Sequence, residues 1–323
     1  MSVILLTNHY GRKPREILKK VVPKGFELIT LKKSTKTELL NEAHKANYFL
    51  VSGRLPIDEE VLNKAVNLKM IQRTGVGTDM LDEKVIRQKN IPVYVNHGVN
   101  ARSVAEHTIM LMLSVLRQLP TAHATVKSGK WKRHELGLKS NELCKKNIGL
   151  VGLGNIGLNV VKMLQPFDVK IFYFKPSRLS IKQENLLNIT YCELHELLKK
   201  VDILSLHCPL NSETQELIGK DEIAMVKRGA VIINTARGGL INEDALVEAL
   251  QTGHLKGAGI DVYKTEPLQG VTQLTALNNV VLTPHQGGIT AEAFQRMMQE
   301  AMENIRLFEK GLFKQIEQNK IKI

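Results

Sequence analysis

The chain has 323 residues, of which 43% are hydrophobic and 24% charged, as in an ordinary soluble globular protein. This length exceeds what one hydrophobic core usually supports, so two domains are expected. The net charge of +13 comes from lysines and arginines spread among acids, and no apolar run reaches the ~20 residues of a membrane helix. Neither nucleic acid nor a membrane is therefore expected as a partner, and the basic surface is expected to be solvated, with part of its charge attracting small anions.

The cysteines predict neither a disulfide framework nor a metal motif, because Cys144, Cys192 and Cys208 are few, odd in number and far apart. No cluster of histidine, cysteine and carboxylate side chains has ligand spacing, so no metal is expected. The N-terminus lacks a basic region and a long apolar run, and is expected to be a strand rather than a signal peptide. These features predict a cytoplasmic protein.

The first 98 residues alternate between strand-like and helix-like segments, which predicts a parallel sheet with helices on its faces. The expected strands are 3–6, 27–31, 48–51, 68–72 and 91–95, and the expected helices are 14–21, 36–46, 59–65 and 80–89. The loop 73–79 follows one of these strands. Its glycines would allow backbone N–H groups to point at an anion, and a plain structural loop is the alternative.

The middle of the chain begins with an apolar helix at 103–116, continued by a more polar helical stretch to about residue 128. His107 is expected to pack or form a hydrogen bond rather than to catalyse. The alternation then resumes, with strands at 148–151, 169–174, 201–206, 230–234, 258–262 and 280–282 and a helix at 242–251. A helix at 291–309 would return the chain to the first domain, and the basic tail 310–323 is expected to be surface-bound or frayed.

A glycine-rich turn between the strand 148–151 and the following helix is the main motif. Gly152 allows a tight turn, Gly154 lets the backbone approach a pyrophosphate, and Gly157 lets helix and strand pack closely. The free N–H groups at the start of the helix would then face the phosphates. Because the glycines stand between a strand and a helix, they predict a dinucleotide site.

Three ionisable residues follow strands of this second region: Arg237, Glu266 and His285. Since the carboxyl ends of parallel strands share one edge, all three are expected at the edge where the cofactor binds. The arginine can bind a carboxylate bidentately and polarise an adjacent ketone, and a protonated histidine can donate the proton that accompanies hydride transfer. Glu266 would orient the His285 ring and favour its charged form. The pattern indicates a 2-oxo or 2-hydroxy acid substrate.

Seven motifs along nearly the whole chain resemble those of the D-isomer-specific 2-hydroxyacid dehydrogenase family. They are G-V-G-T-D at 75–79, V-A-E-H at 104–107, G-L-G-N-I-G at 152–157, H-C-P-L at 207–210, N-T-A-R-G-G at 234–239, G-I-D-V-Y-K-T-E-P at 259–267 and T-P-H-Q-G-G at 283–288. The resemblance implies an enzyme that acts on the CH–OH group of donors, with Arg237 binding the substrate carboxylate, His285 as the acid/base and Glu266 as its support.

The resemblance also implies a fold and further site residues. The fold is α/β, with a Rossmann-like dinucleotide-binding domain (100–289) inserted into a flavodoxin-like substrate domain (1–99 and 290–323), the active site in the cleft between them, and usually a homodimer. The backbone at Val76 and Gly77 would bind the substrate carboxylate. The remaining cofactor contacts that it implies are Asn155, Ile156, His207, Cys208, Pro209, Thr214, Thr235, Ala236, Asp261 and Gly287.

The cofactor site departs from the NAD pattern. The second strand of a NAD-preferring site normally ends in an acid that accepts hydrogen bonds from the ribose, but here Lys175 occupies that place and Arg178 follows. Both would attract a 2′-phosphate, so NADP is favoured and NAD remains the alternative. If Lys175 is merely solvated, the enzyme would accept either cofactor.

The substrate is left open between two branches of the family. Arg73 and the run 129–131 are similar to those of phosphoglycerate dehydrogenases, but Ser52 replaces a second expected arginine, with Arg54 close by. Reduction of glyoxylate or hydroxypyruvate agrees better with an NADP site. A dinucleotide-sensing corepressor is the alternative from another class, and formate oxidation is disfavoured because Glu266 stands where those enzymes have an amide.

Overall fold

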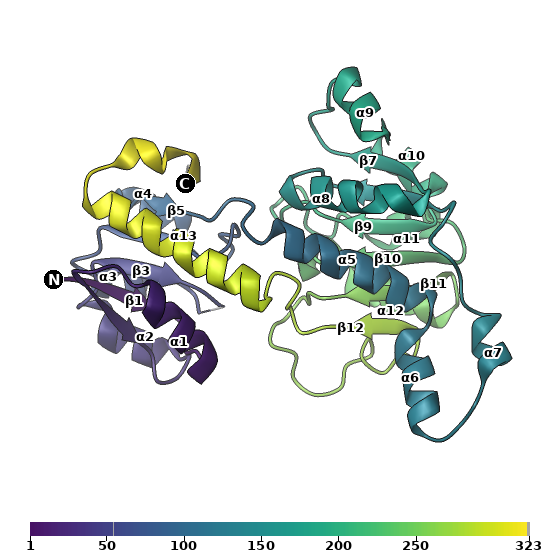
Figure 1. Cartoon of the computed structure of the whole chain (residues 1–323), viewed down its shortest axis with the longest axis horizontal. Helices are drawn as coiled ribbons and strands as arrows, with labels where there is room; N and C mark the ends of the chain where they lie inside the picture. Colours follow the sequence, from purple (N-terminus) through teal and green to yellow (C-terminus); the bar gives the residue numbers. More distant parts are fainter. Residues whose placement is uncertain (54, 322–323) are drawn as a thin grey trace. The chain divides into compact units, whose positions relative to one another are not determined.

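A computed structural model describes residues 1–53 and 55–321 of the chain. These residues form two compact units, one made of Met1–Asn100 and Ile289–Ile323 and the other of Ala101–Gly288. Each unit contains a mostly parallel sheet with helices against it, so the predicted α/β class is confirmed (Figure 1). Within the described part of the chain, we find no helix that is both long and apolar enough to span a membrane.

The sheet of the first unit has the strand order β13-β5-β4-β3-β1-β2, and only β13 is antiparallel to its neighbour. Its strands are β1 (Ser2–Leu6), β2 (Phe26–Thr30), β3 (Tyr48–Val51), β4 (Met70–Arg73), β5 (Val93–Tyr94) and β13 (Lys320–Ile321). Its helices are α1 (Arg12–Val21), α2 (Lys36–Ala43), α3 (Glu59–Lys64), α4 (Glu83–Gln88) and α13 (Ala291–Glu309). Every residue of the central strand β3 is buried, because apolar side chains cover both faces of the sheet.

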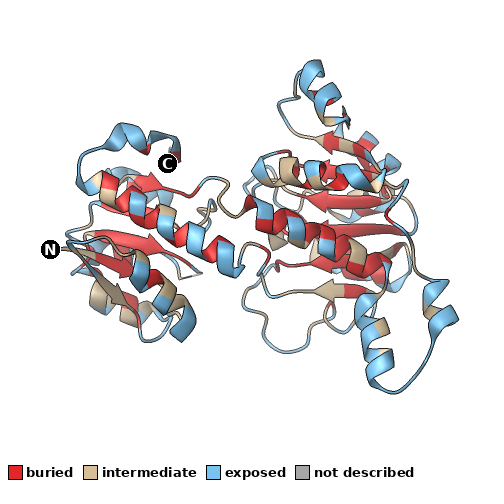
Figure 2. Ribbon diagram, in the orientation of Figure 1, coloured by how far each residue is buried: buried red, intermediate tan, exposed pale blue. Residues whose placement is uncertain are grey.

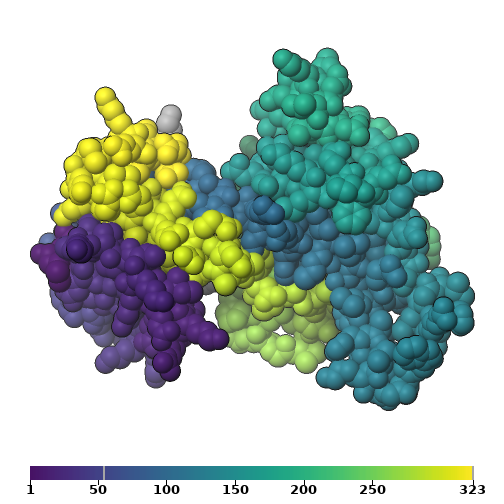
Figure 3. All heavy atoms as spheres, viewed as in Figure 1, coloured from purple at the N-terminus to yellow at the C-terminus, as the bar shows by residue number. Residues whose placement is uncertain are grey.

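The C-terminal segment completes this first unit. Buried residues of α13, including Met298, Ala301 and Ile305, join the same core as β1 and β3, and Figure 3 shows α13 lying directly against N-terminal residues. The described residues of the tail that follows, 310–321, are bound rather than frayed, which decides between the two outcomes expected from the sequence. Ile316 is 1% exposed, and β13 pairs with β5, because that edge strand offers unpaired backbone groups.

The sheet of the second unit has the order β12-β11-β10-β9-β6-β7-β8, and all of these pairings are parallel. The strands are β6 (Asn147–Val151), β7 (Lys170–Phe174), β8 (Ile189–Tyr191), β9 (Ile203–Leu206), β10 (Ala230–Asn234), β11 (Leu255–Ile260) and β12 (Val280–Leu282). The helices are α5 (Ala101–Leu116), α6 (Leu119–Lys127), α7 (Arg133–Gly137), α8 (Asn155–Leu164), α9 (Ile181–Leu187), α10 (Leu194–Lys200), α11 (Lys220–Met225) and α12 (Glu243–Gln251).

Apolar cores lie on both faces of this second sheet, so the central strands appear buried throughout in Figure 2. One core contains residues of α5 and α8, and the other contains residues of α10, α11 and α12. Burial on both faces explains why β9 and β10 are buried at every position and mostly apolar rather than alternating. The sheet therefore forms a rigid platform for the loops at its two edges.

Some predicted boundaries were wrong for local reasons. The helix expected at 80–89 begins only at Glu83, because the Asp82 side chain caps it by accepting a hydrogen bond from the Val85 N–H. The short helix α9 was not predicted, since its one buried residue is Glu184 and it has no apolar stripe.

Candidate active site

The glycine turn lies at the point where the strand order of the second unit reverses. β6 has β7 on one side and β9 on the other, so the loops after these strands diverge there. Gly152 has φ +98°, and a Cβ at this position would lie 2.5 Å from the carbonyl carbon of His207. A Cβ on Gly157 would lie 2.7 Å from the Gly152 oxygen. Both positions therefore require glycine, as predicted from their places in the motif.

Gly154 differs from these two glycines, because a Cβ there would meet no atom of the described residues within 4 Å. It immediately precedes α8, whose first turn has no side-chain cap at the N-terminus. The N–H groups of that turn, including those of Asn155 and Ile156, are thus left to other acceptors. An open glycine beside an uncapped helix start fits the pyrophosphate of a dinucleotide.

Lys175 directly follows β7 and is half-buried, and its ammonium has no ion pair or hydrogen bond with residues 1–53 and 55–321. Arg178 is differently placed, because Glu184 accepts hydrogen bonds of 2.8 Å from both its Nε and its Nη2. The guanidinium also lies 5.2 Å from the centre of the Tyr191 ring. The hydrogen bond from Arg178, joined by one from Tyr173, lowers the pKa of Glu184 to about 2. Arg178 is thus engaged by a carboxylate, unlike Lys175.

The residues after β9 contact the glycine turn. The His207 N–H donates to the Val151 carbonyl, and its Nε2 is 2.9 Å from Ser205 Oγ. Burial lowers the pKa of His207 to about 4 and raises the pKa of Cys208 to about 11, so both are neutral near pH 7. His207 Nδ1 is buried without a partner among the described residues. A buried donor or acceptor in this position is suited to a ligand at the turn.

The loop after β9 is closed by the Thr214 hydroxyl, which donates to the Pro209 carbonyl at 2.7 Å. It also accepts from the Asn211 N–H at 2.8 Å. The hydroxyl therefore shapes this loop, and Pro209 is exposed on it.

The loop after β10 is organised by Asn234. Its side-chain oxygen accepts from the Ala236 N–H at 3.0 Å, and its amide donates to the Arg237 carbonyl at 2.8 Å. Thr235 is buried, and its hydroxyl lies 2.9 Å from that of Thr108. Asn234 was not singled out from the sequence, although an asparagine at a strand end is a known turn signal.

Arg237 is half-buried, and its Nη1 donates to the Ala236 carbonyl at 2.7 Å. The next residue, Gly238, has a backbone so close to the following loop that an added Cβ would lie 2.0 Å from the Tyr263 carbonyl carbon. The segments that carry Arg237 and Glu266 are therefore in direct contact.

Glu266 and His285 are hydrogen-bonded to each other. His285 Nδ1 is 2.7 Å from Glu266 Oε2, and Glu266 Oε1 accepts from the Tyr263 N–H at 2.9 Å. The Glu266 side chain is 9% exposed and that of His285 37% exposed, so the imidazole keeps an accessible face. Because β10, β11 and β12 are parallel neighbours, the expectation that Arg237, Glu266 and His285 share one edge of the sheet is confirmed.

Asp261 fixes the loop that carries His285. Its carboxylate accepts from the N–H groups of Gln286 at 2.9 Å and Gly287 at 2.8 Å, and from the Thr283 hydroxyl at 2.6 Å. Burial alone would raise the pKa of Asp261, but these hydrogen bonds and one from His107 lower it. His285 has φ +51°, a conformation that costs about 1–3 kcal/mol for a non-glycine residue and persists only where neighbours enforce it.

His107 forms hydrogen bonds, as predicted: its Nε2 is 2.9 Å from Thr283 Oγ1. Since Thr283 donates its own proton to Asp261, Nε2 must carry the proton and donate. That His107 and Thr283 both contact Asp261 could not be predicted from the sequence, because α5, the loop after β11 and the loop after β12 meet only in the folded unit.

In the first unit, Arg73 ends β4, and its Nε donates to the Gly77 carbonyl at 2.7 Å. This bond closes the loop that contains Val76, whose side chain is 49% exposed. The loop therefore has Val76 exposed at the carboxyl edge of that sheet. Arg54, the other predicted substrate contact, lies outside the described residues.

Comparison with known proteins identifies this architecture. Residues 109–287 match the family described as D-isomer specific 2-hydroxyacid dehydrogenase, NAD binding domain. The hydroxypyruvate reductase of Thermotoga maritima is 38% identical over 279 residues, which cover 86% of this chain and 89% of that protein. The chain belongs to the D-isomer specific 2-hydroxyacid dehydrogenase family.

Other members of the family extend the comparison. The D-3-phosphoglycerate dehydrogenase of Methanocaldococcus jannaschii is 40% identical over 259 residues, but these are 80% of this chain and only 49% of that protein. The structure of D-lactate dehydrogenase from Aquifex aeolicus, complexed with NAD and lactic acid, matches with a TM-score of 0.85 and 28% identity, covering 99% of each chain.

Membership in this family makes the chain an NAD(P)-dependent oxidoreductase that acts on the CH–OH group of 2-hydroxy acids. The dinucleotide-sensing alternative is not favoured, because the relatives above are named as enzymes. Across the described residues, no group of three or more histidines, cysteines and acids could bind a metal ion.

Proposed function

We propose that this dehydrogenase interconverts a small D-2-hydroxy acid and its 2-oxo acid, with His285 as the acid/base and Arg237 as the carboxylate anchor. The observation that supports this most is the 2.7 Å pair of His285 and Glu266 at the sheet edge that also carries the glycine turn. In this proposal Ala101–Gly288 is the dinucleotide-binding domain, and the other unit is the substrate domain.

The proton position on His285 follows from its partner. An ionised carboxylate only accepts hydrogen bonds, so Nδ1 must donate to Glu266 Oε2. The exchangeable proton for the substrate is then on Nε2, which donates to the ketone oxygen during reduction and accepts from the hydroxyl during oxidation. The bound nicotinamide cofactor supplies or accepts the hydride. Glu266 is a positioning residue that orients the ring and stabilises its charged form.

Arg237 would bind the substrate carboxylate through two parallel N–H···O bonds, which fix the adjacent carbonyl in one orientation. The loop that carries it is pre-shaped by the two hydrogen bonds of Asn234 and by the close packing of Gly238 on Tyr263. The order of this loop reduces the entropy lost when the substrate binds. The remaining proposed contacts are backbone groups at Val76 and Gly77, with Arg73 holding their loop in place.

NADP(H) is the proposed preference of the cofactor site. Lys175 is the supporting residue, because it replaces the usual acid at the end of β7 and has no partner among residues 1–53 and 55–321. Arg178 contributes less than its position in the sequence suggested, since Glu184 already engages it on two nitrogens.

A homodimer is the proposed assembly. The segment α6–α7 in the second unit exposes apolar side chains, including Leu119, Val126, Trp131 and Leu138, with exposures of 55%, 58%, 81% and 87%. No residue of α6 or α7 is buried. A helical segment of this kind is typical of a surface covered by a second copy.

The deciding experiment follows the absorbance of NADPH or NADH during separate additions of glyoxylate, hydroxypyruvate, phosphohydroxypyruvate and pyruvate. Cofactor oxidation that depends on His285 supports the proposal, and the preferred pair distinguishes the two branches. If no pair is oxidised while the cofactor binds, the proposed substrates are wrong.

A further inference from the structure

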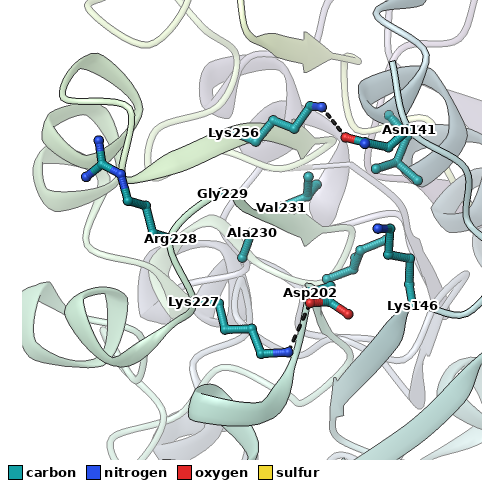
Figure 4. A pocket seen from close by; sticks show the side chains of 11 residues that line it. Asn141, Lys146, Asp202, Lys227, Arg228, Gly229, Ala230, Val231 and Lys256 are labelled. Carbon is teal, nitrogen blue, oxygen red and sulfur yellow. Dashed lines mark hydrogen bonds and ion pairs between the residues drawn. The ribbon is translucent and has the colours of Figure 1, made fainter. Parts of the chain in front are cut away.

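A small pocket lies at the amino ends of the strands in the second unit's sheet, opposite the carboxyl ends that carry the candidate active site (Figure 4). Its charged lining residues are Lys146 before β6, Asp202 before β9, Lys227 and Arg228 before β10, and Lys256 in β11. The volume is about 80 Å³. A buried water needs ~10–15 Å³ on this measure, so the pocket has room for an ion with several oxygens.

The pocket has more positive than negative charge. Asp202 is its one acidic lining residue, and its oxygens already accept from Lys227 Nζ at 3.0 Å and from the Asn147 N–H at 2.8 Å. Lys256 donates to neutral oxygens, the Lys139 carbonyl at 2.8 Å and the side chain of Asn141. Figure 4 shows Lys227 directed at Asp202 and Lys256 at Asn141, with Arg228 pointing away from them.

Lys146 is the group that most needs a partner. It is half-buried, and its ammonium makes no hydrogen bond or ion pair to any residue that the structure describes. Burial, and then the charge of Lys146, lower the pKa of Lys256. The pocket is therefore lined by two lysines without a carboxylate partner for either, an arrangement that an anion would relieve.

We propose that this pocket binds a phosphate-type oxyanion, either free phosphate or the phosphate group of a small metabolite. Lys146 and Lys256 are the charged donors, and Lys227 is shared with Asp202. The pocket is distinct from the glycine turn, because the five residues of β6 separate Lys146 from Gly152. At a rise of ~3.3 Å per residue the two sites are roughly 20 Å apart.

Calorimetric titration of inorganic phosphate into the NADPH-saturated enzyme at constant ionic strength tests the proposal. Saturation with NADPH blocks both the pyrophosphate site and the proposed 2′-phosphate site at Lys175. Lys146→Gln should weaken phosphate binding at least about tenfold, since it removes a charged hydrogen-bond donor. Lys162→Gln is the matched control, because Lys162 is an exposed lysine of α8 outside the pocket and should change the affinity less than about twofold.

Asp202→Asn should act in the opposite direction and tighten binding by about threefold or more, because it removes the one negative charge but keeps an acceptor for the Asn147 N–H. Unaltered affinity in Lys146→Gln would overturn the proposal, as would weaker binding in Asp202→Asn. Phosphate bound elsewhere would respond to neither change.

A parallel thermal unfolding series separates binding from misfolding. Without phosphate, Lys146→Gln should unfold at the wild-type temperature, since its side chain has no partner to lose among the described residues. Phosphate should raise the unfolding temperature of wild type but not of this variant. Glycerol 3-phosphate in the same assay distinguishes the sources: tighter binding than inorganic phosphate indicates a metabolite, and equal binding indicates the free ion.

Discussion

The carboxyl edge and the amino edge of the second unit's sheet, where its strands end and begin, differ in how their charged side chains are paired. At the carboxyl edge the buried acid Asp261 has hydrogen-bond donors on both oxygens, and Glu266 is paired with His285. At the amino edge the ammonium of Lys146 has no partner among residues 1–53 and 55–321, and Lys256 has only neutral ones. The same strands thus carry acids with hydrogen-bond partners at one end and an excess of positive charge at the other.

This difference shows what each edge is built to do. A satisfied network keeps side chains in one geometry, which catalysis requires because a small displacement of an acid/base or an anchor lowers the rate strongly. Uncompensated ammonium groups do not favour a single geometry, but they raise the affinity for an anion. The following variants test the carboxyl edge of this comparison, from the largest expected effect to the smallest.

Removal of the acid/base should have the largest effect. His285→Ala should lower kcat by about 10²–10⁴-fold, because the proton would have to come from water. Cofactor affinity, measured by NADH fluorescence, should change little. Glu266→Gln is the companion variant: it should retain more activity and alter the pH dependence of kcat/KM, since it affects the proton only through His285. A wild-type kcat in His285→Ala would disprove the assignment.

Arg237→Lys should come next. The change keeps the charge but loses the planar pair of donors, so kcat/KM for a 2-oxo acid should fall by about 10²-fold, mainly through KM. Steady-state kinetics measure this effect. Arg228→Lys, at the other edge, is the control and should leave kcat/KM unaltered within about twofold. Equal losses in both variants would show that the carboxyl edge has no special role.

Gly154→Ala and Gly152→Ala separate cofactor binding from folding. A methyl at Gly154 meets no described atom within 4 Å, so the variant should unfold at the wild-type temperature but bind NAD(P)H about tenfold or more weakly. A methyl at Gly152 would lie 2.5 Å from the His207 carbonyl carbon, so that variant should lose stability itself. Thermal unfolding and fluorescence titration distinguish the two, and identical behaviour of both variants would contradict the argument.

Lys175→Asp should reverse the cofactor preference. The carboxylate would repel a 2′-phosphate and accept hydrogen bonds from ribose hydroxyls, so the ratio of kcat/KM for NADPH over NADH should fall by about tenfold or more. Arg178→Gln should change this ratio less, because Glu184 already engages Arg178. A larger effect from Arg178→Gln would show that Arg178, and not Lys175, determines the selectivity. A wild-type preference for NADH would remove the basis of the proposal.

Asp261→Asn should have the smallest effect and the clearest pH dependence. At pH 7 we expect the free energy of unfolding to fall by about 1–3 kcal/mol, because the amide cannot accept all the hydrogen bonds of the carboxylate. The pKa of Asp261 is below its ordinary 3.8, so its contribution is complete above that pH and is lost as the pH falls through the folded-state pKa. As the pH is lowered from neutral, the unfolding temperatures of wild type and Asp261→Asn should converge. A difference that stays constant with pH would contradict this.

Much of the site could be predicted from the sequence because its signals are local. The glycine turn needs only a strand, three glycines and a helix in succession, and the steric demand at Gly157 comes from Gly152 within the same motif. Arg237 and His285 could be placed on one edge because parallel strands end together. Arg178 could not be interpreted correctly, since its partner Glu184 is in a helix without an apolar pattern.

The sequence by itself determined the α/β class, the dinucleotide turn and the residues at the strand ends, because these depend on periodicity and on single-residue steric limits. Only the tertiary structure decided which groups share a partner. Asp261 gathers donors from the loop after β12 and from α5, and Lys146, Asp202 and Lys256 meet from separate strand ends. Such groups are distant along the chain, and the charge of each depends on neighbours that only folding brings into contact.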